Sequence, residues 1–354
     1  MHHMYGNNDV KRLRHQKFWT REQENPLLLI SLPQQFPLLQ FTALCRLLSG
    51  CTELKAADLD PSLYIQDYER QWQEALVVPG SGYWAARPLP GVPWVEGMLG
   101  CTIRSTGNDL WAQWPNGEFS LDFIPTFVGN PWQDKYLEFI RVLQIQAGGR
   151  YPVAQSILRG PSDVAGAILG GTKLIMACYD RPILMRSLFE AVAEAFLALV
   201  RAQWSLVSPF EGGYVMNGFG LWCPNQCIVF QEDLATILSP SLYRKLLLEI
   251  DYKLAEAFPY SGIHLHQSSL FLLDEILQLE PLNLVQITCE NVSTGLEEVI
   301  KAGQKVLQSK HLLLSGFFSR QQIDKLINSL PLQGLALQIF ISSIQETEDL
   351  LDLS

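Results

Sequence analysis

The sequence is short of positive charge. Among its 354 residues, 26 lysines and arginines stand against 36 aspartates and glutamates, giving a net charge of -10 and a pI near 5.1. Nucleic acids and anionic membrane surfaces bind proteins through basic patches. The charge balance therefore excludes both as the main partner, and we expect a small-molecule substrate.

Cysteine pairs at metal-binding or redox spacing are also missing. The seven cysteines extend from Cys45 to Cys289 without a C-x-x-C pair, a pattern typical of a reduced cytoplasmic protein. Cys223 and Cys227 form a C-x-x-x-C pair, but no second pair of ligands follows at the spacing of a structural zinc site. We expect neither a disulfide framework nor structural zinc.

No apolar run is long enough to suggest a membrane span. Residues 1–19 are polar and basic and lack the apolar core of a signal peptide, and the apolar stretch 188–200 is short and is followed by Arg201. With 48% hydrophobic and 18% charged residues, the composition is that of an ordinary globular protein. We expect a cytoplasmic chain with one domain over residues 1–354, in which residues 1–25 form an N-terminal extension.

Short apolar runs alternate with helical segments along the chain, and this alternation indicates the fold. We expect strands at residues 26–33, 151–158, 214–222, 262–266, 283–289, 311–315 and 335–341. We expect helices at residues 60–72, 130–146, 164–169, 182–204, 239–258, 269–279, 296–308 and 320–329. Residues 78–127 are rich in Gly, Pro and Trp and are typical of strands and long loops. Repeated strand and helix units of this size imply a parallel sheet.

The absence of a G-x-G-x-x-G motif decides between two parallel architectures. An open dinucleotide-binding sheet would carry this motif after its first strand, and the segment from Ser31 onward does not. Roughly eight strands, most of them followed by a helix, fit a closed barrel better. We therefore expect an α/β fold, a (β/α)8 TIM barrel with an N-terminal helical and loop elaboration.

Two of the six histidines, His264 and His266, flank a single leucine in the strand predicted at residues 262–266. Alternate side chains of a strand point to the same side, so both imidazoles can face one ligand or substrate. In a barrel, the ends of the strands carry the active site. We expect the following residues at one mouth: His266, Trp222, Cys289, Glu290 and Ser315.

Several segments carry a family resemblance. They are Gly149-Arg150-Tyr151-Pro152, Gly160-Pro161-Ser162-Asp163, Asp180-Arg181-Pro182, Leu221-Trp222-Cys223-Pro224, Gln231-Glu232-Asp233-Leu234, Ser239-Pro240-Ser241 and His264-Leu265-His266. In this order they resemble the uroporphyrinogen decarboxylase superfamily, over roughly residues 90–350. That superfamily includes zinc-dependent methylcobamide:coenzyme M methyltransferases and is related to cobalamin-independent methionine synthase. The resemblance implies a (β/α)8 barrel enzyme.

The chain departs from the decarboxylases after its first strand. There the decarboxylases carry an arginine-rich segment that holds the carboxylates of the substrate. Here Ser31-Leu32-Pro33-Gln34-Gln35 occupies that place, without an arginine. A porphyrinogen with many carboxylates would meet an acidic protein without this cradle, which disfavours decarboxylation of the usual porphyrinogen.

The chain also departs from the methyltransferases, which bind zinc through a His-x-Cys pair and a later cysteine. His264 and His266 stand in the first position, but residues 335–340 contain no cysteine, so Cys289 or Glu290 would supply the third ligand. Imidazoles in place of thiolates leave the metal more positive and favour activation of water over a soft thiol. Zinc on His264, His266 and Cys289 is one hypothesis. A metal-free pair that hydrogen-bonds the substrate is the alternative.

Two further polar residues are candidates for the site. The family pattern makes Asp233 an acid/base candidate, although a solvated acidic turn is the simpler interpretation. Arg159 stands at the end of a predicted strand, where it would either anchor an anion or form a surface salt bridge.

Four other residues carry weaker predictions. Trp222 would either stack on a flat ligand or plug the barrel. Trp94 and Glu96 are expected to line the mouth on the family pattern alone. Asp163 is expected to cap the helix that it begins.

Three functions remain open. The first is methyl transfer from or to a small methylated compound or corrinoid, with a corrinoid protein as partner. The second is a decarboxylase or lyase, in which the two histidines and Asp233 handle the proton and Arg159 holds a second carboxyl group. The third is a barrel that binds a small ligand without turnover. The dimers common in the family and the apolar stretch 335–341 lead us to expect a homodimer.

Overall fold

The computed structural model describes residues 8–32, 37–115, 119–125, 129–290 and 292–353. Its centre is a six-stranded parallel sheet. The strand order is β1 (Leu27–Ser31), β11 (Leu335–Phe340), β10 (His311–Gly316), β9 (Leu284–Thr288), β8 (Tyr260–His266) and β7 (Cys227–Gln231). The first and last of these strands along the chain, β1 and β11, pair in parallel, as the closure of a barrel requires.

Two extended segments fill the gap between β1 and β7; the first contains Ser81 and Ala86, and the second contains Val153 and Gln155. In the first segment, the amide of Ser81 donates to the carbonyl of Leu28 in β1 at 3.0 Å. The first segment is bridged in parallel to the second at Ala86 and Val153. Together with the six strands they make a ring of eight, which confirms the predicted (β/α)8 barrel.

A side chain replaces the backbone ladder where the second segment meets β7. The buried Gln155 donates from Nε2 to the carbonyl of Val229 (2.6 Å) and accepts from the Val229 amide at Oε1 (3.2 Å). A side-chain amide offers the same donor and acceptor as a peptide group, so both buried backbone groups of Val229 are satisfied. For this reason residues 151–158, predicted as a strand, form an extended segment with one isolated bridge.

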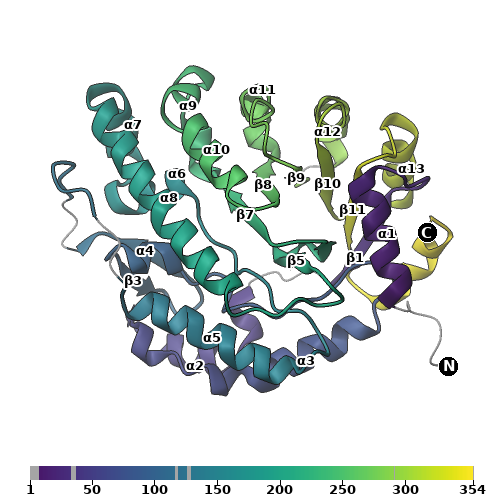
Figure 1. The fold of residues 1–354 in the computed structure, drawn as a ribbon, viewed down its shortest axis with the longest axis horizontal. Coiled ribbons are helices and arrows are strands. Elements are labelled where there is room, and N and C mark those ends of the chain that lie inside the picture. Colours follow the sequence, from purple (N-terminus) through teal and green to yellow (C-terminus); the bar gives the residue numbers. More distant parts are fainter. Residues whose placement is uncertain (1–7, 33–36, 116–118, 126–128, 291, 354) are drawn as a thin grey trace.

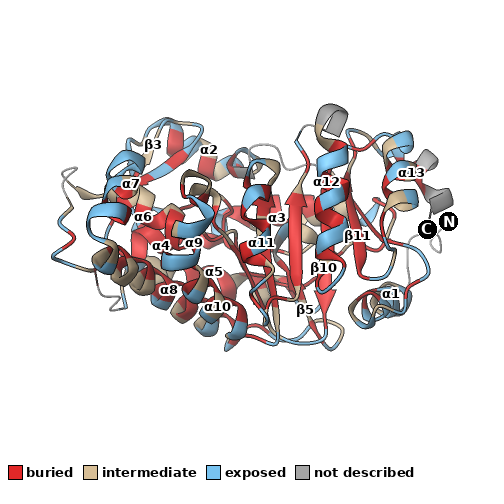
Figure 2. Ribbon diagram, turned by 90° about the horizontal axis from the view of Figure 1, so that it is seen from above, coloured by how far each residue is buried: buried red, intermediate tan, exposed pale blue. Residues whose placement is uncertain are grey.

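Helices cover the outside of the barrel. They are α1 (Asn8–Thr20), α2 (Thr42–Ser49), α3 (Ile65–Leu76), α4 (Trp94–Met98), α5 (Pro131–Ala147), α6 (Pro161–Leu169), α7 (Gly171–Asp180), α8 (Pro182–Trp204), α9 (Pro240–Leu246), α10 (Leu248–Glu256), α11 (Leu273–Ile276), α12 (Val292–Val306) and α13 (Arg320–Ser329). In Figure 1, α7, α9, α11, α12 and α13 form an arc outside β7 to β11, and α2, α3 and α5 lie on the opposite side. Figure 2 shows buried strands inside and exposed faces on the outer helices.

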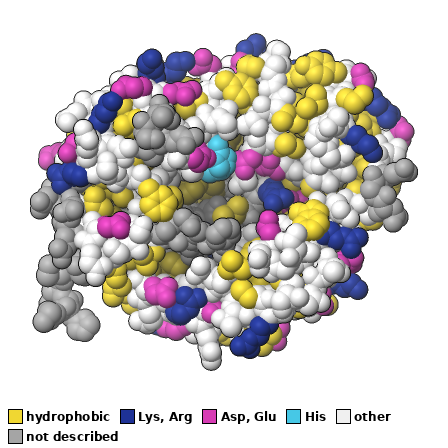
Figure 3. Space-filling model, turned by 180° about the vertical axis from the view of Figure 1, so that it is seen from behind, with side chains coloured by type: hydrophobic (Ala, Val, Ile, Leu, Met, Phe, Trp, Pro, Cys, Tyr) yellow, Lys and Arg dark blue, Asp and Glu magenta, His cyan; other side chains and the backbone are white. Residues whose placement is uncertain are grey.

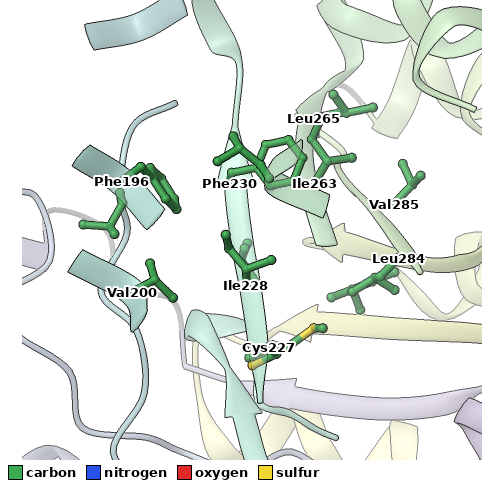
Figure 4. Packing of buried hydrophobic residues seen from close by; sticks show 14 of the residues in the cluster. Phe196, Val200, Cys227, Ile228, Phe230, Ile263, Leu265, Leu284 and Val285 are labelled. Atoms are coloured by element: carbon green, nitrogen blue, oxygen red, sulfur yellow. The ribbon is translucent and has the colours of Figure 1, made fainter. Parts of the chain in front are cut away.

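Alternation along the strands separates the core from the interior of the barrel. In Figure 4, side chains of β7 lie beside those of α8: Ile228 and Phe230 beside Phe196 and Val200. Ile263 and Leu265 of β8 belong to the same buried cluster, at 0% and 2% exposure. The alternating His264 and His266 therefore point the other way, into the barrel.

Helix α1 and a hairpin close the N-terminal ends of the strands. The hairpin consists of β5 (Tyr214–Met216) and β6 (Leu221–Cys223). Trp19 of α1 donates its indole N–H to the carbonyl of Trp222 (2.7 Å), and His15 accepts from the Trp222 amide (3.0 Å). The prediction of one strand over residues 214–222 is therefore wrong, because Gly220, at φ +68°, takes part in the turn that reverses the chain. The strand after it, β7, was not predicted.

The other predicted elements are present with small differences, whereas α2 and α7 were not predicted. The helix predicted at residues 239–258 is divided at Leu247 into α9 and α10, and the helix predicted at 269–279 begins as a 3-10 turn, η7 (Gln267–Leu272). A small antiparallel sheet contains β2 (Glu53–Leu54), β3 (Thr102–Ser105) and β4 (Leu110–Gln113). Residues 33–36, with Gln34 and Gln35 of the arginine-free loop, lie outside the described residues. None of the described helices has the length and apolar character to cross a membrane.

Candidate active site at the mouth of the barrel

His264 and His266 lie at the C-terminal end of β8 with their rings close together. Their Nε2 atoms are 3.2 Å apart, and the two ring planes meet at 84°. His264 shares a register with Gln231 of β7 and Gln286 of β9, and His266 pairs with Thr288. Both imidazoles thus face one point at the mouth.

The outer nitrogen of each imidazole faces an acceptor. Nδ1 of His264 hydrogen-bonds to Oε1 of Gln286, and Nδ1 of His266 to Oε1 of Glu290. The Gln286 amide is oriented by its Nε2, which donates to the Thr288 hydroxyl at 3.0 Å. With a proton on each Nδ1, neutral rings carry a lone pair on each Nε2. Two lone pairs at 3.2 Å repel each other, so the pair calls for a metal ion or a proton between them.

Asp233 completes this cluster. It begins a 3-10 turn, η6 (Asp233–Ile237), two residues after β7 ends. Its Oδ1 lies 3.7 Å from Nε2 of His266, and its Oδ2 accepts from Gln231 at 2.8 Å. The candidate ligand atoms of Asp233, His264 and His266 all lie within 4.8 Å of one another, and no other such group occurs in the described part of the chain.

The donor set fits a divalent metal with an open coordination position. Tetrahedral zinc holds nitrogen and oxygen ligands at about 2.0–2.1 Å, which places them roughly 3.3 Å from one another. The Nε2–Nε2 distance of 3.2 Å and the Nε2–Oδ1 distance of 3.7 Å are close to this spacing. Burial lowers the pKa of His264, which keeps that ring neutral. The bonds of Gln286 and Glu290 to the outer nitrogens are those that orient metal-binding histidines.

Two carboxylates hold η6 against α6: a carboxylate of α6 accepts from amides of η6, and a carboxylate beside η6 accepts from an amide of α6. Asp163, in the first turn of α6, accepts from the amides of Leu234 (2.7 Å) and Asp233 (3.3 Å). Glu232 accepts from the amide of Ser162 at the start of α6 (2.8 Å). Asp163 thus caps η6 and not, as predicted, its own helix. The exchange fixes the position of Asp233.

Buried carboxyl groups form a cluster behind Asp233. Burial raises the pKa of Asp163 and of Asp251 to about 7, and it raises the pKa of Glu232 well above its usual range. Tyr243 donates to Oδ2 of Asp251 at 2.5 Å, whereas Oδ1 of Asp251 and Oε1 of Glu232 are buried without a hydrogen-bond partner among the described residues. Because burial disfavours the ionised form of a carboxyl group, the cluster retains a proton near neutral pH.

The protonated cluster predicts a pH dependence of stability. Because folding raises these pKa values, their stabilising contribution is complete below the unfolded pKa of about 4 and is lost as the pH rises through about 7. Burial lowers the pKa of His15 and His311 to about 4, which opposes this trend only below about pH 6.5. We expect the free energy of unfolding to fall by on the order of 1 kcal/mol between pH 6.5 and 8.

Urea denaturation at the two pH values measures this fall. Asp251→Asn removes one titrating group and should reduce the fall. Glu194→Gln alters an exposed carboxyl on α8 and serves as the control. If the free energy of unfolding fell equally between the two pH values in wild type and in Asp251→Asn, the cluster would not be the cause of the pH dependence.

Arg159 and Glu96 form an ion pair near this cluster. Nη1 of Arg159 lies 3.3 Å from Oε1 of Glu96, whose side chain is 1% exposed, whereas that of Arg159 is 39% exposed. Burial raises the pKa of Glu96, and the charge of Arg159 opposes this rise. The same guanidinium also lowers the pKa of Asp163. Glu96 therefore holds the guanidinium from its buried side, and the exposed side of the guanidinium can contact a ligand.

Two predicted mouth residues lie elsewhere. Trp222 is 2% exposed in the hairpin at the N-terminal ends of the strands, where its indole donates to the Phe210 carbonyl at 3.0 Å. Trp94 is 1% exposed and packs edge-on against Tyr136 and Phe139. Both bury large aromatic surfaces in the packing, and this role explains their positions without a ligand.

Cys289 does not reach the cluster of Asp233, His264 and His266. It is 3% exposed, its thiol faces the carbonyl of Ile287, and burial raises its pKa to about 12. Gln286 and Thr288 of the same strand line the interior, so alternation turns Cys289 away. The third candidate ligand atom is instead that of Asp233, and Glu290 hydrogen-bonds to Nδ1 of His266.

A pocket of about 390 Å³ extends from His264 into the barrel. Its polar lining is contributed in part by inward-facing strand residues: Gln231, His264, Gln286, Thr288, Ser315 and Gln338. Figure 3 shows a hollow at the centre of one face, with a histidine and acidic side chains beside it. Gln286 was missed from the sequence, although an amide in the apolar run Leu284–Thr288 marks an inward position.

Comparison with known proteins identifies the fold. No protein-family model and no curated protein matches this chain. Among solved structures, a methyltransferase from Methanosarcina mazei superposes with a TM-score of 0.64, covering 97% of each chain at 13% sequence identity. The chain therefore shares its α/β barrel fold with a methyltransferase.

Proposed function

We propose that this chain is a metal-dependent methyltransferase that acts on a small methylated compound at the mouth of the barrel. The observation that carries the proposal is the facing pair of Nε2 atoms of His264 and His266, 3.2 Å apart beside the carboxylate of Asp233. Lone pairs and a carboxylate converging on one point are a site for a cation. The fold shared with a methyltransferase supports the reaction class.

Zinc is the metal that this donor set suits best. His264, His266 and Asp233 would hold it, and it would supply a Lewis acid that polarises the group to which the transferred methyl is attached. The other residues of the site orient these ligands: Gln286 and Glu290 hydrogen-bond to the two rings, and Gln231 hydrogen-bonds to Asp233.

The methyl group needs an acceptor or donor, and we propose a corrinoid held by a partner protein. The proposal rests on the sequence resemblance to the uroporphyrinogen decarboxylase superfamily, of which this chain would be a divergent member. In that role the open mouth faces the partner, and the small substrate occupies the pocket beneath it. Arg159, open at the mouth, is the candidate contact for an anionic group of either.

A proton-transfer reaction is the second candidate. The distance of 3.2 Å between the two Nε2 atoms also suits a proton shared between the imidazoles, and Glu290 would stabilise the positive charge. Such a pair could deliver the proton that replaces a carboxylate, with Asp233 beside it and Arg159 holding a second carboxyl group. This would make the chain a carboxy-lyase.

A methyl-transfer assay decides between the two. The zinc-loaded full chain is incubated with cob(I)alamin and methanol or methoxyacetate, and methylcobalamin is followed by its absorbance. We expect methylcobalamin from at least one donor: the methyl C–O bond breaks as the bond to cobalt forms, and the departing oxygen takes a proton to leave as water from methanol or as glycolate from methoxyacetate. Neither product should form after the metal is removed with a chelator. Carbon dioxide release from carboxylated compounds by the metal-free chain, without methyl transfer in the zinc-loaded chain, would replace the first candidate with the second.

A further inference from the structure

The mouth of the barrel carries an aromatic pair, Phe317 and Phe340, besides the cluster of Asp233, His264 and His266. Phe340 is the last residue of β11, and it lines the same pocket as His264. Phe317 lies directly after β10, and its ring meets that of Phe340 at 60°, with the ring centroids 5.6 Å apart. Phe317 is 44% exposed. A large apolar ring therefore remains open to a ligand at the mouth.

Alternation along the strands turns both rings of the aromatic pair toward the interior of the barrel. Ser315 of β10 and Gln338 of β11 line the pocket, and they are paired in register. Phe317 follows Ser315 by two residues, and Phe340 follows Gln338 by two. The aromatic pair thus lies on the same side of the strands as these polar residues, one layer nearer the mouth.

The aromatic pair belongs to the same layer as Glu290, which hydrogen-bonds to His266. Thr288 of β9 is paired with Ser315 of β10. Two residues further along each chain segment, the same register brings Glu290 beside Phe317. Neighbouring strands lie about 4.8 Å apart, so the aromatic pair begins one strand away from the carboxylate that orients His266.

The mouth is therefore divided into a polar side and an aromatic side. The ends of β7, β8 and β9 carry the imidazoles and carboxylates, whereas the ends of β10 and β11 carry the aromatic pair. Figure 3 shows hydrophobic as well as acidic side chains around the hollow. A ligand that contacts both sides has a polar end at the histidines and an apolar end at the aromatic pair.

A flat ring is the apolar group that fits the aromatic pair best. Aromatic rings prefer edge-to-face or offset-stacked contacts, and these contacts stabilise a complex beyond the area that they bury. The exposed surface of Phe317 offers such a contact to the ring of a ligand. The pocket of about 390 Å³ lies at the lower end of known ligand pockets, a size that suits a single-ring compound and not a tetrapyrrole.

We propose that the methyl donor is an aryl methyl ether, whose ring lies against Phe317 and Phe340 while its ether oxygen lies at His264 and His266. The reaction at the ether oxygen rests on the proposed function, whereas binding of the ring does not. The methyl C–O bond breaks as the methyl carbon bonds to the cobalt of the reduced corrinoid, and the departing phenolate takes a proton from water. A phenol is a stronger acid than an aliphatic alcohol, so the phenolate leaves more readily than an alkoxide.

A matched pair of probes tests the ring site in the chelator-treated full chain, without metal. 4-Methoxyphenol has a flat ring, and trans-4-methoxycyclohexanol carries the same substituents on a saturated ring. In calorimetric titration we expect 4-methoxyphenol to bind about 3- to 10-fold more tightly, as contacts between aromatic rings allow. The double variant Phe317→Leu, Phe340→Leu keeps the apolar bulk without the rings, and it should remove this preference.

A control variant separates the ring site from effects of exposed aromatic residues in general. Phe123→Leu alters a phenylalanine that is 66% exposed beside Asp122, which is paired with Arg181 between α7 and α8. Its preference for 4-methoxyphenol should equal that of the wild type, and urea denaturation shows whether each variant is folded. The proposal is overturned if the wild type binds the two probes equally, or if the preference persists in the double leucine variant.

Turnover tests the class of methyl donor. With cob(I)alamin, the zinc-loaded full chain should convert 4-methoxyphenol into hydroquinone and methylcobalamin in equal amounts, with a higher kcat/KM than trans-4-methoxycyclohexanol. The double leucine variant should lose this selectivity. If the variant instead raises the KM for cob(I)alamin and keeps the selectivity between donors, the aromatic pair contacts the corrin ring and the proposal is overturned.

Failure of the ring site and failure of the proposed function give different results. A preference for 4-methoxyphenol in a chain that never takes up metal supports the ring site and rejects the metal centre. Methyl transfer from methanol by a zinc-loaded chain that binds both probes equally supports the metal centre and rejects the ring site.

Discussion

Replacing His264 and His266 together with alanine should abolish metal binding and lower the rate of methyl transfer by at least about 1000-fold. Each ring supplies one of the three converging ligand atoms, and Asp233 alone cannot hold a divalent metal against water. The rate is measured with the corrinoid assay, and the metal by mass spectrometry of the dialysed protein. Because both side chains are partly exposed at the mouth, the fold should survive the change.

Two control variants make this result specific. Cys289→Ala alters a thiol that the sequence suggested as a ligand but that faces away from the cluster, so metal content and rate should remain as in the wild type. Glu290→Gln keeps the shape of the side chain but weakens its contact to Nδ1 of His266. We expect the rate of methyl transfer to fall by about 10- to 100-fold. Metal retained by the double histidine variant, or lost in Cys289→Ala, would contradict the assignment of ligands.

Replacing Gly160 with alanine should destabilise the fold by about 2–3 kcal/mol and reduce metal affinity as well. Its Cβ would lie 2.1 Å from the carbonyl of Gln231 and 2.4 Å from Oε1 of Glu232. Neither can yield easily, because Gln231 is held in β7 and Glu232 caps α6. The end of β7 must shift, and Asp233 shifts with it.

The matched control is Gly171→Ala at the start of α7, where a Cβ would meet nothing within 4 Å. Urea denaturation gives the stability of both variants, and zinc titration gives their affinity. If Gly160→Ala were as stable as Gly171→Ala, the close contact between α6 and β7 would not be what positions Asp233.

Local patterns in the sequence were sufficient to predict the barrel and the histidine pair. The strand at residues 262–266 and the helix at 320–329 were predicted because each has its own periodicity and boundaries. The period of two in β8 also predicted that His264 and His266 share a side. These features depend only on neighbours in the chain.

The features that depend on distant contacts were not predicted. The hairpin around Gly220 was taken for one strand although Asn217-Gly218 interrupts its apolar residues, and β7 was missed because it follows without a helix. The seam closed by the Gln155 side chain has no local pattern.

The error at Cys289 illustrates how sensitive site predictions are to register. Glu290 and Cys289 are adjacent, and a shift of one residue exchanges the inner and outer faces of a strand. The amide at Gln286 fixes the correct register, because a polar side chain within an apolar strand must face the interior of the barrel. Counting from Gln286 puts Thr288 inside and Cys289 outside.

The most direct test of the metal centre is a crystal of the zinc-loaded full chain measured on both sides of the zinc absorption edge. The account predicts one anomalous peak per chain, bounded by Nε2 of His264, Nε2 of His266 and Oδ1 of Asp233. A chain loaded with excess zinc that shows no peak between these three atoms, or a peak at other ligands, would contradict it.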